Sequence, residues 1–207
     1  MKQAKTRRGT ETRDRILTAA AELIHERGVT GTSVDDILAA SGTGKSQFYL
    51  YFESKDGLVR EVLDHNLEVT LSAQEALLER LSTWKGIKAW LDALVDMHER
   101  RGLFGGCRIG SLAAEMTERD EELRLAIAAA FSRWESFLVA GLEAIRDRGG
   151  LLSGADPHTL AETTMASIQG GYLLSTTKKD IRPMRNALGA AYSHLRSFQA
   201  TPARRTP

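Results

Sequence analysis

The sequence contains a single cysteine, Cys107, and five widely separated histidines among its 207 residues. One cysteine cannot form an internal disulfide, and no second cysteine or closely spaced pair of histidines offers a structural metal site. We therefore expect no disulfide, no metal and no cofactor.

Long hydrophobic runs are absent as well. No apolar stretch approaches the roughly 18 to 20 residues that a membrane-spanning helix needs. The first residues, MKQAKTRRGTETR, also do not resemble the apolar segment of a signal peptide. These absences predict a cytoplasmic protein without a membrane partner. Hydrophobic residues still make up 42% of the chain, which is enough to fill a packed core.

The net charge is only +1, although a protein that binds nucleic acid needs cations for the phosphates. Residues 1–15 hold six basic and two acidic residues, so this segment carries +4 and the rest of the chain carries −3. A mobile basic arm of this kind steers a protein toward DNA, but a merely solubilising tail has the same composition. Charge alone does not decide between these two interpretations.

Strand signals are nearly absent, whereas Ala, Leu, Glu and Arg recur at helical spacing, so the predicted fold class is all-α. The first predicted helix ends at Gly28, and its apolar residues fall on one face. The residues of this face are Ile16, Leu17, Ala20, Leu23 and Ile24. Ser33 is predicted to cap a short second helix, because its hydroxyl can accept from the amide three residues on.

A glycine turn, Ser41-Gly42-Thr43-Gly44, separates this helix from residues 45–52, KSQFYLYF, which also have helical character. Two short helices around a tight turn are typical of a helix-turn-helix, whose second helix enters the major groove of DNA. Phe48 and Phe52 are predicted to anchor that second helix. The residues left on or near the outward side are Lys45, Ser46, Gln47, Tyr49, Leu50 and Tyr51. The alternative is that the two tyrosines are half-buried core residues and that Lys45 is only a solvated charge.

Ser54 is predicted to cap a longer helix that begins at Lys55 and runs toward Arg80, connecting two lobes. Gly149-Gly150 predicts a helix end with a left-handed turn, and Asp156-Pro157 predicts a helix start. Further helices are predicted at residues 85–101, 107–117, 120–148, 157–177 and 183–199. The last residues, 201–207, contain two prolines and no apolar anchor, so we expect disorder there.

Residues 12–58, TRDRILTAAAELIHERGVTGTSVDDILAASGTGKSQFYLYFESKDGL, resemble the DNA-binding region of the TetR family of ligand-responsive repressors. The resemblance includes the first-helix pattern, the Ser-Gly turn, the Lys-x-x-Phe-Tyr-x-Tyr-Phe helix and Ser-Lys-Asp. It implies a three-helix helix-turn-helix domain with a basic N-terminal arm at residues 1–54. A long helix would join it to a helical ligand-binding and dimerisation domain at residues 55–207. Two departures are Gly44, where the family often has a capping serine, and Leu50, where it often has histidine or an aromatic residue.

The resemblance further implies a homodimer that represses transcription from a palindromic operator in double-stranded DNA. A small-molecule effector, apolar or amphipathic, would release it. The implied DNA contacts are Ser33, Lys45, Ser46, Gln47, Tyr49, Leu50, Tyr51 and Lys55, with the last on a phosphate. An enzyme and a helical scaffold are the rival functions. The nearest catalytic set is His98, Glu99 and Cys107, which nothing in the sequence orients, so we expect no enzyme.

The C-terminal part is predicted to hold its large side chains inside, and Phe137 is expected among them. Each of these residues alone is more simply a core residue. The resemblance implies an effector site lined by Trp84, Trp90, Met97, Phe104, Cys107, Phe131 and Trp134. The segment around Cys107 also resembles family members with a cysteine at a pocket-side helix. A thiol next to Arg108 can react as a thiolate, so a redox or electrophile sensor is the alternative function, and a packing thiol is the plainer interpretation.

The last two long helices carry apolar stripes with small residues nearby, which allow helices to approach closely. The resemblance implies that these stripes form a two-fold four-helix bundle at the dimer interface, and packing within the chain is the alternative. The implied interface residues are Leu160, Thr164, Ile168, Tyr172, Leu188, Ala191 and Leu195.

Overall fold

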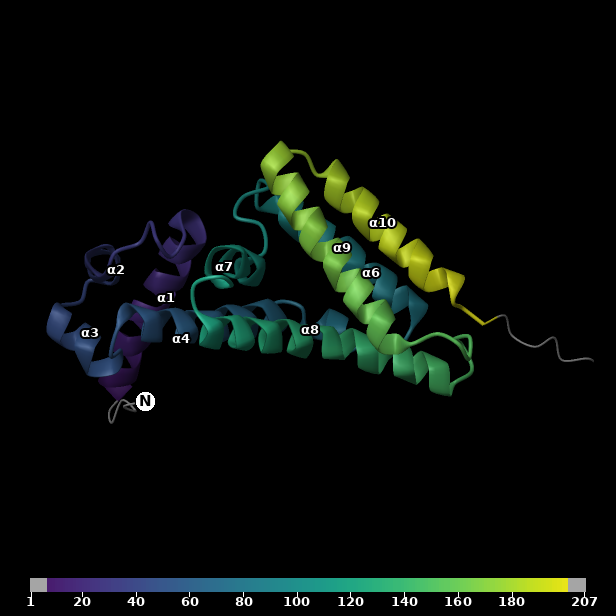
Figure 1. The fold of residues 1–207 in the computed structure, drawn as a ribbon, viewed down its shortest axis with the longest axis horizontal. Coiled ribbons are helices and arrows are strands. Elements are labelled where there is room, and N and C mark those ends of the chain that lie inside the picture. The colour runs from purple at the N-terminus through teal and green to yellow at the C-terminus, as the bar shows by residue number, and fades with distance from the viewer. Residues whose placement is uncertain (1–6, 201–207) are drawn as a thin grey trace, which may run out of the picture. The chain divides into compact units, whose positions relative to one another are not determined.

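A computed structural model of the chain describes residues 7–200, and within this range the chain forms ten α-helices and no β-sheet. The predicted all-α class is confirmed. The helices are α1 (Arg7–Arg27), α2 (Val34–Ser41), α3 (Lys45–Tyr51), α4 (Lys55–Ser72), α5 (Glu75–Leu78), α6 (Trp84–Arg100), α7 (Arg108–Met116), α8 (Glu121–Asp147), α9 (Pro157–Lys178) and α10 (Arg182–Ser197) (Figure 1). The tail at 201–207, for which disorder is predicted, lies outside the described residues.

The chain divides into two compact units. The first comprises residues 7–70 and 108–130, and the second comprises residues 71–107 and 131–200. This division differs from the predicted ranges 1–54 and 55–207, because α7, most of α4 and the start of α8 group with the three N-terminal helices. Nearness in sequence therefore does not determine which elements pack together.

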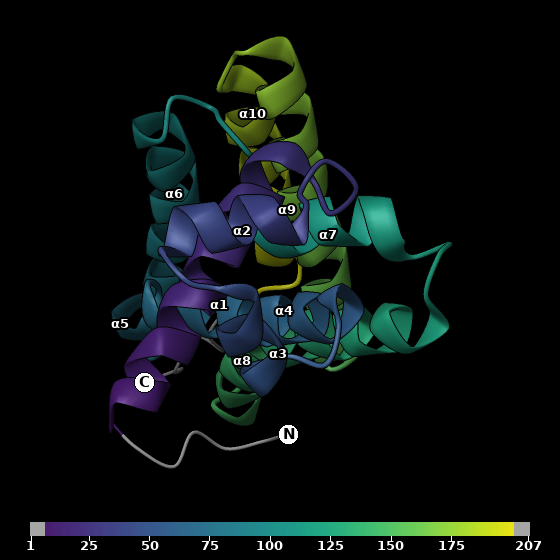
Figure 2. The ribbon, with the colours of Figure 1, turned by 90° about the vertical axis from the view of Figure 1, so that its left-hand side faces the viewer.

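The core of the first unit forms where α1 meets α2 and α3, which face the viewer in Figure 2. Ile16 and Ala20 on α1 are completely buried, as the apolar stripe predicts, and Leu23 is half-buried. α1 begins at Arg7, so the predicted mobile arm is wrong for the described residues from Arg7 onward. An ion pair of 3.1 Å between Arg7 and Glu11, one turn apart, favours helix at this end. Lys2 and Lys5 of the predicted arm lie outside the described residues.

The predicted connector helix is wrong at its C-terminal end. α4 ends at Ser72 instead of continuing toward Arg80, and a separate short helix, α5, follows it. Between them the side chain of Gln74 is buried and its Oε1 accepts a hydrogen bond of 2.7 Å from the indole N–H of Trp90. A buried amide needs such a partner, and the break in the helix brings Gln74 to it.

In the second unit α10 packs against both α9 and α6 (Figure 1). Asp156 caps α9 by accepting hydrogen bonds from the amides of His158 and Thr159, with Pro157 in the first turn as predicted. Gly149 adopts a positive φ of 71° after α8, which confirms the predicted left-handed turn. A Cβ on Gly171 would lie 3.1 Å from Met184, so the glycine permits the close packing of α9 on α10.

α8 has the length and mean hydropathy, 1.3 over its most apolar window, that a membrane-crossing helix requires. Length and composition alone are weak evidence, because core helices of other proteins meet the same criteria. Arg133 and Glu135 interrupt the apolar sequence near the middle of the helix. Two charges at that depth oppose insertion into a bilayer, so α8 does not overturn the expectation of no membrane partner.

Candidate nucleic-acid interface

Local capping interactions fix both ends of α2. Ser33 caps α2 by accepting a hydrogen bond of 3.1 Å from the Asp36 amide, and the Asp36 carboxylate accepts one of 2.9 Å from the Ser33 amide. The Ser33 hydrogen bonds hold the pKa of Asp36 below its ordinary value. Gly42 ends α2 with a φ of 62°, in the left-handed region that favours glycine. The predicted cap and glycine turn are therefore confirmed.

α3 begins without a serine cap. Gly44 occupies the N-cap position, and the Gln47 side chain accepts a hydrogen bond of 3.2 Å from the Gly44 amide. This bond satisfies a backbone donor at the helix start that would otherwise face only water. Gln47 therefore compensates in part for the capping serine that Gly44 replaces.

Two phenylalanines hold α3 against the rest of its unit. Phe48 is fully buried and Phe52 is 2% exposed, with ring centroids 5.6 Å apart. The guanidinium of Arg13 lies 5.6 Å from the centre of the Phe52 ring and pairs with Glu61. The predicted anchoring role of the phenylalanines is confirmed. The Arg13 contact is an addition, because its partner Glu61 lies 48 residues away in the sequence.

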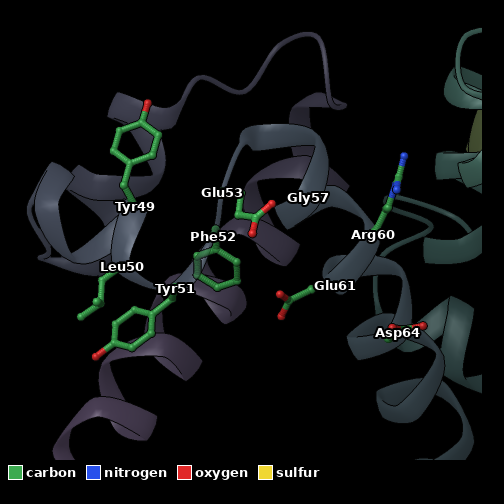
Figure 3. A pocket seen from close by; sticks show the side chains of 9 residues that line it. All are labelled: Tyr49, Leu50, Tyr51, Phe52, Glu53, Gly57, Arg60, Glu61 and Asp64. Carbon is green, nitrogen blue, oxygen red and sulfur yellow. The ribbon is translucent and has the colours of Figure 1, made fainter. Parts of the chain in front are cut away.

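The remaining side chains of α3 face solvent. Tyr49 is 57% exposed and Leu50 is 52% exposed, and Figure 3 shows Tyr49 and Tyr51 extending from the helix in opposite directions. Lys45, Ser46 and Gln47 are exposed and Tyr51 is half-buried. The predicted outward presentation is confirmed for all of these except Tyr51, which is only partly accessible. Their contact with DNA stays a prediction.

The two predicted contact lysines already have partners in the chain. Lys45 forms an ion pair of 3.2 Å with Asp35, and both side chains are mostly exposed. Such a pair is weak in water, so Lys45 can exchange Asp35 for a group on DNA. Lys55 is half-buried and its ammonium donates to the carbonyl of Val29. This structural role of Lys55 was missed by the sequence analysis.

A pocket of about 330 Å³ lies between the end of α3 and α4 (Figure 3). Its lining combines the α3 residues Tyr49, Leu50 and Tyr51 with the charged residues Glu53, Arg60, Glu61 and Asp64. Burial raises the pKa of Glu61 and its neighbour Asp64 raises it further, although Arg13 opposes both. Carboxylates outnumber the single guanidinium of Arg60 at this pocket, whereas Lys45 lies at the other end of α3.

The predicted effector-site residues have different environments in the second unit. Trp90, Trp134 and Cys107 are buried, whereas Trp84, Met97 and Phe131 are half-buried. The prediction that Phe104 and Phe137 lie inside is wrong, since they are 55% and 37% exposed. Phe104 follows Leu103 in a turn where the φ of Leu103 is 58°, and its ring lies 5.5 Å from the ammonium of Lys179.

Six of the seven predicted dimer residues are buried within the single chain, so they cannot form a surface between two copies. They are Leu160, Thr164, Ile168, Leu188, Ala191 and Leu195. Their apolar stripes pack in the contact of α9 with α10. Tyr172 is half-buried, with its ring 4.9 Å from that of His98. The prediction is corrected in favour of packing within the chain.

No catalytic or metal-binding arrangement emerges in the described residues. Glu99, a member of the predicted catalytic set, instead forms an ion pair of 3.4 Å with Arg185 on α10. Residues 7–200 also contain no cluster of His, Cys, Asp or Glu suited to a metal ion. A residue that the sequence analysis missed is Glu115, which contacts the turn between α1 and α2 about 85 residues away.

Two family descriptions match the chain. Residues 16–62 match "Bacterial regulatory proteins, tetR family", and residues 83–189 match "Transcriptional regulator LmrA/YxaF-like, C-terminal domain". The first match includes α2, α3 and the exposed residues of α3, and the second covers more than half of the chain.

Individual proteins show the same similarity. The chain is 33% identical over 175 residues to an HTH-type transcriptional regulator in the lacX 3' region of Lactococcus lactis, covering 82% of this chain and 86% of that one. It is 26% identical over 198 residues to the HTH-type transcriptional repressor NemR of Escherichia coli K12, covering 93% and 96%. The crystal structure of E. coli NemR in its reduced form matches with a TM-score of 0.80 at 25% identity, covering 93% and 99%.

Proposed function

The chain belongs to the tetR family of bacterial regulatory proteins, and we propose that it represses transcription by placing α3 in the major groove of a palindromic operator. Proteins of this family are DNA-binding transcriptional regulators and not enzymes. Repression is inferred from the similar E. coli protein, which is named a transcriptional repressor. In this proposal residues 1–54 bind DNA and residues 55–207 bind an effector and dimerise, in the cytoplasm.

The exposed side of α3 is the observation that carries the proposal. Tyr49 and Leu50 stand in water next to the fully buried Phe48, although large apolar side chains side by side on a surface usually mark a binding site. The major groove offers thymine methyl groups to such side chains. By donor and acceptor geometry, Lys45 suits guanine and Gln47 suits adenine.

The charges around α3 support one orientation of the DNA. The carboxylates of Glu53, Glu61 and Asp64 outnumber the guanidinium of Arg60 at the pocket beyond the end of α3, so the charge there disfavours phosphate. Lys45 lies at the opposite end of the helix. We expect the phosphates to lie toward the Lys45 end of α3, while Tyr49 and Leu50, which border the pocket, face the bases.

A second copy of the chain supplies the second recognition helix in this proposal. The exposed residues of α9 include Leu173, 67% exposed, and Leu174, 47% exposed. Gly170 on α9 and Gly189 on α10 have open space where a side chain would begin, so another helix can approach them closely. This outward face replaces the buried stripes as the proposed dimer surface. The two half-sites should be separated by about one helical turn, 34 to 36 Å, or a multiple of it.

The proposed effector is an apolar or amphipathic small molecule that binds in the second unit and opposes DNA binding. The half-buried Trp84, Met97 and Phe131 support this choice of chemistry, since apolar and aromatic side chains line most small-molecule sites. By linkage, the factor by which effector weakens DNA binding must equal the factor by which DNA weakens effector binding. Unequal factors would contradict the scheme.

The proposal is tested with a DNA duplex that the purified protein selects from a random-sequence library. We expect Tyr49→Ala and Lys45→Ala to weaken binding of this duplex by about tenfold or more each, a usual loss for one base or phosphate contact. The matched control is Lys85→Ala, which removes an exposed lysine from α6. Circular dichroism checks that each variant folds. Unchanged affinity of both α3 variants would refute the assignment of α3.

A second candidate function is sensing of oxidants or electrophiles at Cys107. The thiol is 9% exposed and directly precedes α7. Burial, with the thiol as a second cause, raises the pKa of Tyr172 well above its ordinary value. Alkylation of Cys107 with iodoacetamide tests this function. Loss of duplex binding in the wild type but not in Cys107→Ser supports sensing, and full retention rejects it.

A further inference from the structure

The carboxylate of Glu115, near the end of α7, binds the turn between α1 and α2. It accepts hydrogen bonds of 2.7 Å from the amide of Val29, 2.7 Å from the amide of Thr30 and 2.6 Å from the hydroxyl of Thr30. Hydrogen bonds to an ionised carboxylate are among the stronger ones in proteins. The turn therefore depends on a residue from outside the helix-turn-helix sequence.

The backbone of the turn leaves room for this carboxylate. Gly28 has a φ of 76°, and a Cβ added there would lie 2.7 Å from the Oε2 of Glu115. The positive φ favours glycine at position 28, and a Cβ there would require the carboxylate end of the flexible Glu115 side chain to move. Any larger residue would displace either the turn or the carboxylate.

Further contacts hold α7 in place along its length. Arg119, just beyond α7, donates a hydrogen bond of 2.8 Å to the hydroxyl of Thr30. At the other end, Arg108 forms hydrogen bonds of 2.8 and 3.0 Å with the carboxylate of Glu22 on α1. Burial on its own raises the pKa of Glu115, but the hydrogen bonds from Thr30 and Val29 outweigh it and lower the pKa. The structure therefore favours the charged form that makes these contacts.

The turn that Glu115 binds leads directly to the recognition helix. The peptide groups of Val29 are held from two sides, because its amide donates to Glu115 while its carbonyl accepts from Lys55. Four residues after Val29, Ser33 caps α2, and Gly42 then ends α2 before α3. A change in the turn would thus shift the start of α2 and, through it, the orientation of α3.

We propose that Glu115 is a positioning residue for DNA recognition, which fixes the turn between α1 and α2 and so orients α3 for a specific sequence. Glu115 itself does not contact DNA in this proposal. The inference rests on the proposed function, because it assumes that α3 reads the operator.

The experiment compares two probes, a 30-base-pair duplex selected by the wild-type protein and a random-sequence duplex of the same length. Correct orientation matters for contacts with bases, whereas non-specific binding depends mainly on phosphate charge. We expect Glu115→Ala to weaken binding of the selected duplex by about tenfold or more while the random duplex changes by less than about twofold. Glu115→Gln keeps one acceptor oxygen and should give an intermediate loss. Glu118→Ala, which removes an exposed carboxylate from the same region, is the matched control.

Hydrogen exchange at the amides of Val29 and Thr30 provides an independent measurement, and it should accelerate in Glu115→Ala. Equal affinity of Glu115→Ala and wild type for the selected duplex would overturn the inference. Equal losses on both duplexes would overturn it as well, because they would indicate general destabilisation. If Glu115→Ala fails to fold, Glu115→Gln and Thr30→Val decide by the same criteria. A wild-type protein that selects no duplex refutes the proposed function itself, which separates the two failures.

Discussion

Among individual residues, His98 has the most unusual environment in the second unit. The side chain is 1% exposed, and its Nε2 lies 3.4 Å from the hydroxyl of Thr176. Burial lowers the pKa of this imidazole, and the nearby charges of Arg101 and Lys179 lower it further. His98 is therefore neutral in the folded protein near pH 7.

This environment makes stability depend on pH. In the unfolded chain His98 takes up a proton at its ordinary pKa of 6.5, whereas in the folded chain it does so only at lower pH. The unfolded state thus binds more protons in this window, so the free energy of unfolding should fall as the pH drops below about 6.5. Urea denaturation between pH 7.5 and 5.5 should show this decline in the wild type.

The decline should be smaller in His98→Gln, which has no proton to gain. His194→Gln replaces an exposed histidine on α10 and serves as the control for the loss of a histidine. If His98→Gln and wild type showed identical slopes, the pKa of His98 would have to be the same in the folded and unfolded chains, which would contradict the lowering by burial.

Local interactions were the most predictable at the residue scale. The caps at Ser33 and Asp156 follow from hydrogen bonds to amides two or three residues away, so the sequence pattern is sufficient to find them. The contact of Glu115 with Thr30 was not predictable, because a lone glutamate on a helix gives no sign of a partner 85 residues away.

At the scale of elements, α3 depends on buried phenylalanine rings for its attachment, and Phe48 is the one within the helix. Phe48 is completely buried and contacts Tyr49 edge to face, with ring centroids 5.2 Å apart, as well as Phe52. Since α3 is only seven residues long, it cannot be stable on its own. Its orientation therefore relies on packing rather than on helix propensity.

Replacing the anchor and its exposed neighbour should separate stability from DNA binding. We expect Phe48→Ala to lower the free energy of unfolding by about 3 to 5 kcal/mol, the usual cost of removing a buried phenylalanine ring. Tyr49→Ala should change it by less than about 0.5 kcal/mol, because the side chain is mostly exposed. Urea denaturation of both variants measures the difference, and equal losses would show that Tyr49 is a structural residue.

Element boundaries were predictable where a glycine or proline marks them and less so elsewhere. Gly149 and Pro157 correctly indicate the end of α8 and the start of α9. The end of α4 at Ser72 has no such marker, and the hydrogen bond between Gln74 and Trp90 that accompanies the break joins residues 16 positions apart. The helical spacing of apolar residues therefore predicted a helix that continues past Ser72, where α4 ends.

At the scale of the whole molecule, the main correction concerns which faces of α9 and α10 are buried within the chain. The stripes with Ile168 and Leu195 were expected between two copies but are buried within one chain. An apolar stripe has the same spacing whether its partner is the same chain or another one, so the pattern cannot distinguish these cases. The outward face with Leu173 remains available for a second copy.

A charge on that outward face should prevent dimerisation. We expect the wild type to sediment as a dimer and Leu173→Glu to weaken the dimer by about 100-fold or more, because an isologous interface would bring two buried charges together. Sedimentation velocity at micromolar concentration measures the change. Leu125→Glu alters a leucine of similar exposure on α8 and should leave the dimer intact. Persistence of the Leu173→Glu dimer would place the interface elsewhere.

The central claim is that the outward side of α3 meets DNA, and site-specific photocrosslinking tests it most directly. A benzophenone amino acid is placed at position 50 in one protein and at position 173 in another, and each is irradiated with the selected duplex. The account predicts a covalent adduct with DNA from position 50 and none from position 173. A protein that binds the duplex yet forms no adduct from position 50 would contradict it.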